Sequence, residues 1–201
     1  MKITKIAITG GPCAGKTAAL DRIKEKAKEM GCIVLFVPEL ATVLIKNGVE
    51  PGICGTRDDY QKCLFRLQIE TEKVYEQAAR TMKADKILIV CDRGTLDNKA
   101  YMEPAEFARM LEDAGTNEAE LRAGYHAVFH LVTAAKGAEA FYTTANNAAR
   151  SETAEQAAAL DDKLIAAWTG HSHFLVIGNA GGFDNKMDRL IAEISSLISN
   201  R

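Results

Sequence analysis

The residues with the clearest chemical meaning form a glycine-rich stretch near the N-terminus, GGPCAGKT at positions 10–17, called the glycine loop below. Its glycines let the backbone curl so that successive N–H groups point at phosphate oxygens, and a following helix would add its positive N-terminal end. At this spacing Lys16 can reach the β- and γ-phosphates of a nucleotide, and the Thr17 hydroxyl can ligate Mg²⁺. An ordinary glycine-rich turn is the alternative, but it does not require all eight positions. We therefore predict a nucleotide-binding site that comprises Gly10, Gly11, Pro12, Cys13, Ala14, Gly15, Lys16, Thr17 and Ala18.

Acidic residues follow two later apolar runs. Asp92 and Arg93 come soon after the run 86–90, and Glu39 follows the run 32–37 after a single proline. If both runs are parallel strands, their carboxyl ends meet at the edge of the sheet that holds the glycine loop. We expect Asp92 to bind Mg²⁺, Arg93 to hold a phosphate of the donor or acceptor, and Glu39 to position the attacking hydroxyl or accept its proton. Helix capping is the alternative role for both acids.

Basic and amide side chains supply further candidates around this site. Arg150 lies just before a capping-box pattern at 153–156, which predicts a helix start, and is our candidate for an arginine that closes over the transferring phosphoryl group. Arg57 and Lys136 are weaker candidates of the same kind, with a solvated surface position as the alternative. Asn179 follows the last apolar run and is a candidate contact for the nucleotide base, although Asn-Ala-Gly-Gly is equally a turn sequence.

The elements that must position these residues are visible in the pattern of apolar positions. Long stretches with helical spacing, such as 18–30 and 187–198, alternate with short apolar runs. The alternation predicts right-handed crossovers and an α/β fold, a doubly wound parallel sheet with helices on both faces. The runs have the β-branched, near-continuous apolar composition of strands buried on both faces, and they span 3–9, 32–37, 87–91, 127–132 and 174–177.

A chain of 201 residues has the size of one domain, and no repeat, low-complexity tract or linker divides it. We therefore expect a single nucleotide-binding domain over residues 1–201. Residues 47–57 contain three glycines and a proline and are expected to form a loop beside the carboxyl edge of the sheet. Residues 135–153 precede the capping box and are expected to form a lid segment that can close over a ligand.

The overall charge excludes some classes of partner. With 25 basic and 27 acidic side chains the net charge is −2, which gives no electrostatic reason to expect nucleic acid or an anionic membrane as the main partner. No apolar run approaches membrane-spanning length and the N-terminus lacks a signal-peptide core, so we expect a cytoplasmic protein without a membrane span. The five cysteines show no zinc-ligand spacing. The sequence does not fix the oligomeric state.

Five motifs together carry a resemblance to a known family. The motifs are ITGGPCAGKT at 8–17, VPELAT at 37–42, CDRGTLDNKAY at 91–101, NAARSETAE at 147–155 and WTGHSHFLVIGN at 168–179. With them the sequence resembles the AAA-like P-loop family that includes the nucleotide-binding domain of the TRPL translocation-defect proteins and many bacterial ATP-binding proteins. More distantly it is similar to deoxynucleoside and thymidylate kinases and to the ribosylnicotinamide kinase domain of NadR.

The resemblance implies a five-stranded parallel core and the binding of a nucleoside triphosphate. We expect ATP, with GTP as the second candidate, because the chain lacks the Asn-Lys-x-Asp sequence that selects guanine in small GTPases. The resemblance also places Glu39 at the position of the deoxynucleoside kinases' base, residues 92–93 in their acid-Arg-Ser motif, and Gln61 at their base-recognising glutamine. The chain departs from its relatives at Gly94, which replaces the serine of that motif, and at Gly178, where relatives often have an acidic residue.

The leading hypothesis from the sequence is a Mg²⁺-dependent kinase that transfers the γ-phosphoryl group of ATP to a hydroxyl of a small nucleoside- or nucleotide-like acceptor. The alternative is a regulatory switch or binding module that hydrolyses ATP or GTP slowly and presents loops ordered by the γ-phosphate to a partner. A plain ATPase is the third hypothesis. The predicted catalytic residues are Lys16, Glu39, Asp92, Arg93 and Arg150, and the predicted acceptor-binding residues are Glu39, Arg57, Gln61 and Arg93.

Overall fold

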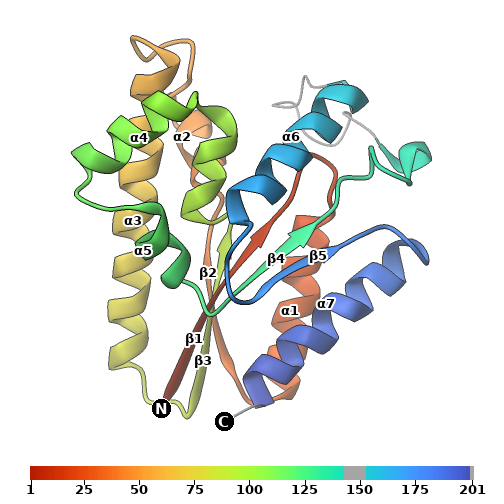
Figure 1. Cartoon of the computed structure of the whole chain (residues 1–201). Helices are drawn as coiled ribbons and strands as arrows, with labels where there is room; N and C mark the ends of the chain where they lie inside the picture. Colours follow the sequence, from red (N-terminus) through yellow and green to blue (C-terminus); the bar gives the residue numbers. More distant parts are fainter. Residues whose placement is uncertain (143–152, 200–201) are drawn as a thin grey trace.

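The structure, a computed structural model, describes residues 1–142 and 153–199. Its centre is a five-stranded, fully parallel sheet in the strand order β2-β3-β1-β4-β5 (Figure 1). The five predicted strands and their parallel arrangement are confirmed, with ends that differ by a residue or so. The strands are β1 (Lys2–Thr9), β2 (Ile33–Val37), β3 (Lys86–Asp92), β4 (Ala127–Leu131) and β5 (Phe174–Ile177).

Helices cover both faces of the sheet, as the alternation of elements predicted. On one face α1 (Lys16–Glu29) and α7 (Gly182–Ser199) lie side by side (Figure 1). Among the described residues, the other face is covered by four helices, with α2 (Leu40–Lys46) and two 3₁₀ segments, η1 (Thr95–Tyr101) and η2 (Glu139–Phe141), in the connections. The four helices are α3 (Arg57–Thr81), α4 (Pro104–Asp113), α5 (Glu118–Ala123) and α6 (Ala154–Trp168).

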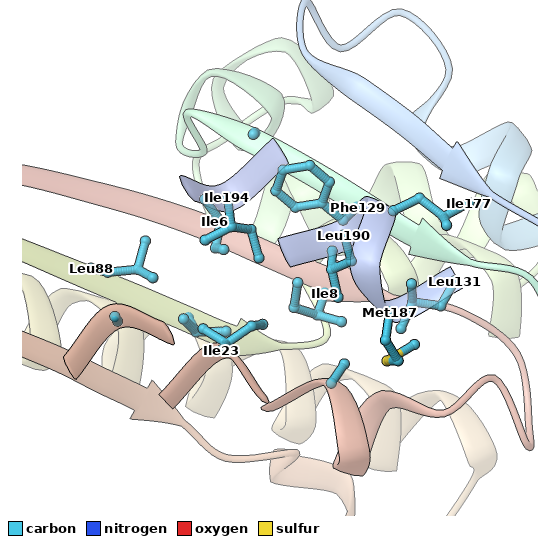
Figure 2. Packing of buried hydrophobic residues seen from close by; sticks show 14 of the residues in the cluster. Ile6, Ile8, Ile23, Leu88, Phe129, Leu131, Ile177, Met187, Leu190 and Ile194 are labelled. Atoms are coloured by element: carbon cyan, nitrogen blue, oxygen red, sulfur yellow. The ribbon is translucent and has the colours of Figure 1, made fainter. Parts of the chain in front are cut away.

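Alternate residues of the central strand serve the two halves of the core. Ile6 and Ile8 of β1 point toward α1 and α7 and contact a cluster that includes Leu190, as Figure 2 shows. Ala7, between them, belongs to the opposite cluster with α3, η1, α4 and α6. All three are fully buried. The period of two expected of a strand therefore places apolar side chains on both faces, which is why the run is continuous rather than alternating.

The loops at the carboxyl edge follow the predicted turn chemistry. Residues 47–56 connect α2 to α3, and α3 begins in a capping box in which the Thr56 hydroxyl accepts a hydrogen bond from the Asp59 N–H while the Asp59 carboxylate accepts one from the Thr56 N–H. The capping box at 153–156 is confirmed at the start of α6. The predicted lid lies mostly outside the described residues, which include only its part 135–142 and its last residue. In the described parts of the chain no helix is long and apolar enough to cross a membrane.

Candidate functional site

The glycine loop connects β1 directly to α1 in a conformation that depends on its glycines. Gly10 and Gly15 have φ values of 145° and 90°, in the region that glycine adopts most readily. A Cβ atom on Gly10 would lie 2.2 Å from the carbonyl oxygen of Leu131, so the loop also needs glycine for close approach to β4. Cys13 adopts a φ of 57° without being glycine. The first turn of α1 has no side-chain cap, which leaves its N–H groups for an anion.

Three carbonyl groups of the loop accept hydrogen bonds from residues outside the loop. The Thr133 hydroxyl donates to the carbonyl of Pro12, the N–H of Ala134 to that of Cys13 at 3.3 Å, and the ammonium group of Lys186 to that of Ala14 at 2.9 Å. Because these carbonyls point away from the cavity, the peptide N–H groups are turned toward its concave side. This is the arrangement expected for phosphate binding.

Asp161, on α6, anchors the start of the loop. It is fully buried, and its Oδ1 atom accepts hydrogen bonds from the N–H groups of Gly11 and Thr133 at 3.0 and 3.1 Å and lies 3.0 Å from Nε2 of His130. Burial opposes its ionisation, but His130 and the two N–H donors lower the pKa of the Asp161 carboxyl. A Cβ atom on Gly11 would lie 3.0 Å from the same oxygen. Any other residue at this position would therefore require the loop or Asp161 to shift.

Lys16 points back along the loop toward its own backbone. Its ammonium nitrogen lies 3.3 Å from the carbonyl oxygen of Gly10. Burial, followed by repulsion from Arg93, lowers the pKa of Lys16, while nearby carboxylates oppose that change. A phosphate group in the loop would supply the anionic partner that favours the charged form.

Glu39 and Arg93 form an ion pair across the ends of β2 and β3. Nε of Arg93 lies 2.6 Å from Oε1 of Glu39, and the hydroxyl of Thr42 donates to Oε2 at 2.6 Å. Burial opposes the ionised form of Glu39, but Arg93, Lys16 and the Thr42 hydrogen bond together lower its pKa to about 2. The Glu39 carboxylate is therefore ionised at neutral pH and already oriented by two partners.

Arg93 is held in an unusual backbone conformation by long-range contacts. Its φ is 77°, in the left-handed region that a residue with a side chain rarely adopts. Its N–H donates to the carbonyl of Ile8 at 3.0 Å, and its own carbonyl accepts from Nε2 of Gln68 at 3.2 Å. Backbone strain of this kind is found where the surrounding structure fixes a functional side chain.

Asp97, on η1, forms an ion pair with Arg93. Its Oδ2 atom lies 3.5 Å from Nη1 of Arg93. The carboxylate also accepts hydrogen bonds from the Thr9 hydroxyl at 2.8 Å and from Nε1 of Trp168 at 2.6 Å. The Asp97 side chain is 3% exposed, so this ion pair is shielded from water, while Nη1 of Arg93 makes no hydrogen bond among the described residues.

Asp92 has the features expected of a magnesium ligand. Its Oδ1 atom is buried and has no hydrogen-bond partner among the described residues. Burial is the main cause that raises the pKa of Asp92, and a divalent cation would reverse that effect. Thr17, at the start of α1, offers a solvent-exposed hydroxyl on the same cavity. Over residues 1–142 and 153–199 no group of three or more acidic, histidine or cysteine side chains could hold a metal alone, so Mg²⁺ would take further oxygen ligands from phosphate and water.

A cavity of about 740 Å³ brings most of the predicted residues together. The glycine loop and the start of α1 line one side of it, and the ends of β2 and β3, the first turns of α3 and part of η1 line the other. Besides Asp92 Oδ1, four polar atoms on this second side are buried without a hydrogen-bond partner in the described chain: Tyr60 Oη, Gln61 Oε1, Arg93 Nη1 and Asn98 Oδ1. The predicted residues that line the cavity are Pro12, Cys13, Ala14, Gly15, Lys16, Thr17, Ala18, Glu39, Arg57, Gln61, Asp92 and Arg93.

Other predicted residues lie elsewhere. Gly10 and Gly11 are buried at the base of the loop. Asn179 does not line the cavity, because its amide donates to the carbonyls of Thr133 and Lys136 at 2.8 and 2.7 Å and accepts from Lys186. Lys136 pairs with Asp161 and Asp162 rather than facing the cavity. Arg150 lies outside the described residues.

The sequence analysis missed several residues of the site. Asp97 and Asn98 lie in a 3₁₀ segment without a periodic pattern, and several of their hydrogen-bond partners, such as Thr9, Gln68 and Trp168, are 30 or more residues away. Gln68 had a detectable signal, since Gln61 and Gln68 lie seven residues apart and interrupt the apolar face of α3. Two such polar residues on a face that packs against a sheet indicate a cavity.

The glycine loop between a central strand and a helix, on a doubly wound parallel sheet, defines the P-loop nucleoside-triphosphatase fold in its kinase-like form. The chain belongs to the AAA-domain family, whose model matches residues 5–186. Among solved structures, a deoxyadenosine kinase from M. mycoides, solved with the products dCMP and a flexible dCDP bound, superposes with a TM-score of 0.61. The two sequences are 14% identical, over 96% of this chain and 100% of that one, so the likeness shows a shared fold. A search of curated proteins gives no match.

Proposed function

We propose that the protein is a Mg²⁺-dependent phosphotransferase that moves the γ-phosphoryl group of ATP to a hydroxyl of a small nucleoside- or nucleotide-like acceptor. The observation that carries the proposal is the position of the Glu39–Arg93 pair. It lies at the carboxyl ends of β2 and β3 and lines the same cavity as the glycine loop. A phosphate-binding loop alone needs only cations and N–H groups, whereas an oriented carboxylate opposite the loop serves to position an attacking hydroxyl.

The donor side would bind the triphosphate. The N–H groups of the glycine loop and of the first turn of α1 hold the phosphate oxygens, and Lys16 exchanges its contact with Gly10 for the β- and γ-phosphates. Asp92 and Thr17 would hold Mg²⁺, which would neutralise charge on the phosphates. GTP is the second candidate donor. Arg150 keeps its proposed role as the arginine that neutralises the transferring phosphoryl group.

On the acceptor side, Glu39 would orient the hydroxyl and Arg93 would stabilise charge. A carboxylate with a pKa of about 2 is a weak base, so Glu39 acts chiefly as the hydrogen-bond acceptor that aims the hydroxyl oxygen at the γ-phosphorus. Phosphoryl transfer through a loose transition state needs positioning more than early proton removal. The carboxylate takes the proton as the new bond to phosphorus forms.

The polar atoms in the acceptor half of the cavity favour a small ligand that both donates and accepts hydrogen bonds. Tyr60 Oη can donate, while Gln61 Oε1 and Asn98 Oδ1 can only accept. Buried groups of this kind cost free energy until a ligand pairs with them. A nucleoside offers donors and acceptors on both its base and its sugar. Arg57 is exposed at the rim of the cavity, where it would meet a phosphate if the acceptor is a nucleotide.

The test is a screen of purified protein with ATP and Mg²⁺ against nucleosides, vitamin-like ribosides and nucleotides, with ADP release measured by a coupled assay and phosphorylated products by mass spectrometry. We expect one acceptor class to stimulate ADP release and gain a phosphate. Glu39→Gln removes the carboxylate that aims the hydroxyl and finally takes its proton, so it should lower kcat by roughly a hundredfold or more while the affinity for ATP stays unchanged. Protein that binds ATP but phosphorylates no acceptor would contradict the proposal and favour a switch or an ATPase.

The narrower family placement and the compartment also remain proposals. Within the AAA-domain family, the motifs around Glu39, Asp92 and Asn179 support kinship with the nucleotide-binding domain of the TRPL translocation-defect proteins and with the ribosylnicotinamide kinase domain of NadR. The proposed use of ATP and the lack of a disulfide at all five cysteines support a role in the cytoplasm. We propose that residues 1–201 work as a single nucleotide-binding domain, with 135–153 as its lid.

A further inference from the structure

A buried lysine lies directly behind the glycine loop. Lys186, on α7, is 2% exposed, although lysine is almost never buried without an ionic partner. Its ammonium group donates to the carbonyl of Ala14 at 2.9 Å, to the carbonyl of Val132 at 2.5 Å and to Oδ1 of Asn179 at 2.9 Å. All three N–H bonds of the ammonium group are thereby used, and every acceptor is uncharged.

The three acceptors belong to the three segments that meet at the phosphate site. Ala14 lies within the loop, Val132 follows β4, and Asn179 begins the turn between β5 and α7. Drawing the Ala14 carbonyl outward turns the adjoining peptide N–H toward the cavity side of the loop. The ammonium group of Lys186, which makes this contact, is positive and therefore favours a bound phosphate. Because the group is buried, water screens its charge only weakly.

We propose that Lys186 is a positioning residue for nucleotide phosphates. It fixes the curvature of the glycine loop through Ala14 and adds a buried positive charge behind the bound anion. Unlike Lys16, it touches no phosphate and acts through the loop backbone. The inference rests on the proposed nucleotide-binding function and extends it to a residue outside the glycine-loop motif.

The charged groups around Lys186 make its role measurable through protons. Burial is the main cause that lowers the pKa of Lys186, to about 8, and repulsion from Arg189 on α7 and Lys16 on α1 adds to it. Asp161 on α6 opposes this change, while the ends of β4 and β5 contribute only neutral acceptors. An anion bound in the loop favours the protonated form. At pH 8 ATP binding should therefore draw up to about half a proton onto Lys186.

The experiment is calorimetric titration of the intact protein with ATP and Mg²⁺, in two buffers of different ionisation enthalpy, at pH 8 and at pH 6. Lys186→Met should weaken ATP binding by roughly tenfold, because it removes both the buried positive charge behind the loop and the hydrogen bond that holds the Ala14 carbonyl. At pH 8 it should also reduce proton uptake by up to about half a proton per nucleotide. At pH 6 the difference in proton uptake should vanish, because Lys186 is already protonated. Lys186→Gln, which keeps a donor without the charge, should lose the same proton uptake and provides a second variant if methionine prevents folding.

Ile194→Ala is the matched control, because Ile194 is a core residue of the same helix, 1% exposed and outside the loop contacts. It should lower the melting temperature while ATP affinity and proton uptake of the folded protein stay unchanged. The inference is overturned if both Lys186 variants bind ATP as the unmodified chain does, with the same proton uptake at pH 8. Unmodified protein that binds neither ATP nor GTP would overturn the proposed function itself, and this inference with it.

Discussion

Position 94 tests how the acceptor side of the site is packed. A Cβ atom on Gly94 would lie 2.4 Å from Cζ2 and 2.8 Å from Cη2 of Trp168, and 3.0 Å from Cβ of Ala7. The φ of Gly94 is −103°, which any residue can adopt, so packing alone excludes a side chain. The Trp168 ring occupies the space that any side chain at position 94 would need, which is why this position holds a glycine.

We predict that Gly94→Ala lowers the free energy of unfolding by about 1–3 kcal/mol, the usual cost of overpacking a buried site. Trp168 cannot retreat freely, because it is fully buried and its Nε1 donates to Asp97 at 2.6 Å. For a domain of this size the loss corresponds to a fall of roughly 2–12 °C in melting temperature. Thermal unfolding followed by circular dichroism, supported by urea denaturation, measures it.

A control and a double-mutant cycle separate packing from other causes. Gly178→Ala is the control, since nothing lies within 4 Å of a Cβ atom there, and it should change the melting temperature by less than about 2 °C. In a Trp168→Leu background the added methyl group has room, so Gly94→Ala should cost less than it does alone. The reasoning would be refuted if the Gly94→Ala protein had the same melting temperature as the Gly178→Ala control. It would also be refuted if the effects of Gly94→Ala and Trp168→Leu on the free energy of unfolding were additive.

Two further predictions concern acid stability and thiol chemistry. The pKa of Glu39 is lowered from 4.5 to about 2, so its pairing with Arg93 stabilises the fold fully above about pH 4.5 and this contribution is lost as the pH falls toward 2. Glu39→Gln should flatten that part of the stability–pH curve in urea titrations, and a curve of unchanged slope would rule the pairing out. Alkylation of Cys13, which lines the cavity, should block ATP binding, whereas Cys13→Ser should still bind ATP after the same treatment of the exposed Cys63. Unchanged affinity of the alkylated, unmodified chain would exclude a contact between Cys13 and nucleotide.

The parts of the site that the sequence predicts are those encoded locally. The glycine loop needs a positive φ at Gly10 and Gly15, which glycine adopts at the lowest conformational cost. The motif can therefore be recognised from the sequence without knowledge of the fold. Glu39 and Asp92 follow apolar runs, and parallel strands bring such ends together at one edge. Local sequence patterns therefore predict the phosphate-binding side of the cavity and the two acids opposite it, Glu39 and Asp92.

The acceptor side and the supports of the loop depend on partners that are distant in the sequence. Asn179 has the composition of a turn and the position of a base contact, but carbonyls 43 and 46 residues away and the ammonium group of Lys186 direct its amide inward. Lys186 and Asp161 lie on helices whose periodicity predicts burial for their positions without indicating a polar partner. Which backbone group each one meets is decided by how α6 and α7 pack on the sheet, a tertiary property that no local pattern contains.

One helix links the two halves of the site. Asp161 of α6 accepts the N–H of Gly11 in the glycine loop, and Trp168 of the same helix donates to Asp97, the partner of Arg93. The two residues are seven positions apart, which is two helical turns, so they project from the same face of a rigid element. The distance between the loop and the Glu39–Arg93 pair is therefore fixed by α6 as well as by the sheet. Because phosphoryl transfer requires donor and acceptor oxygens to be held in line, a shift of α6 would affect both halves of the site together.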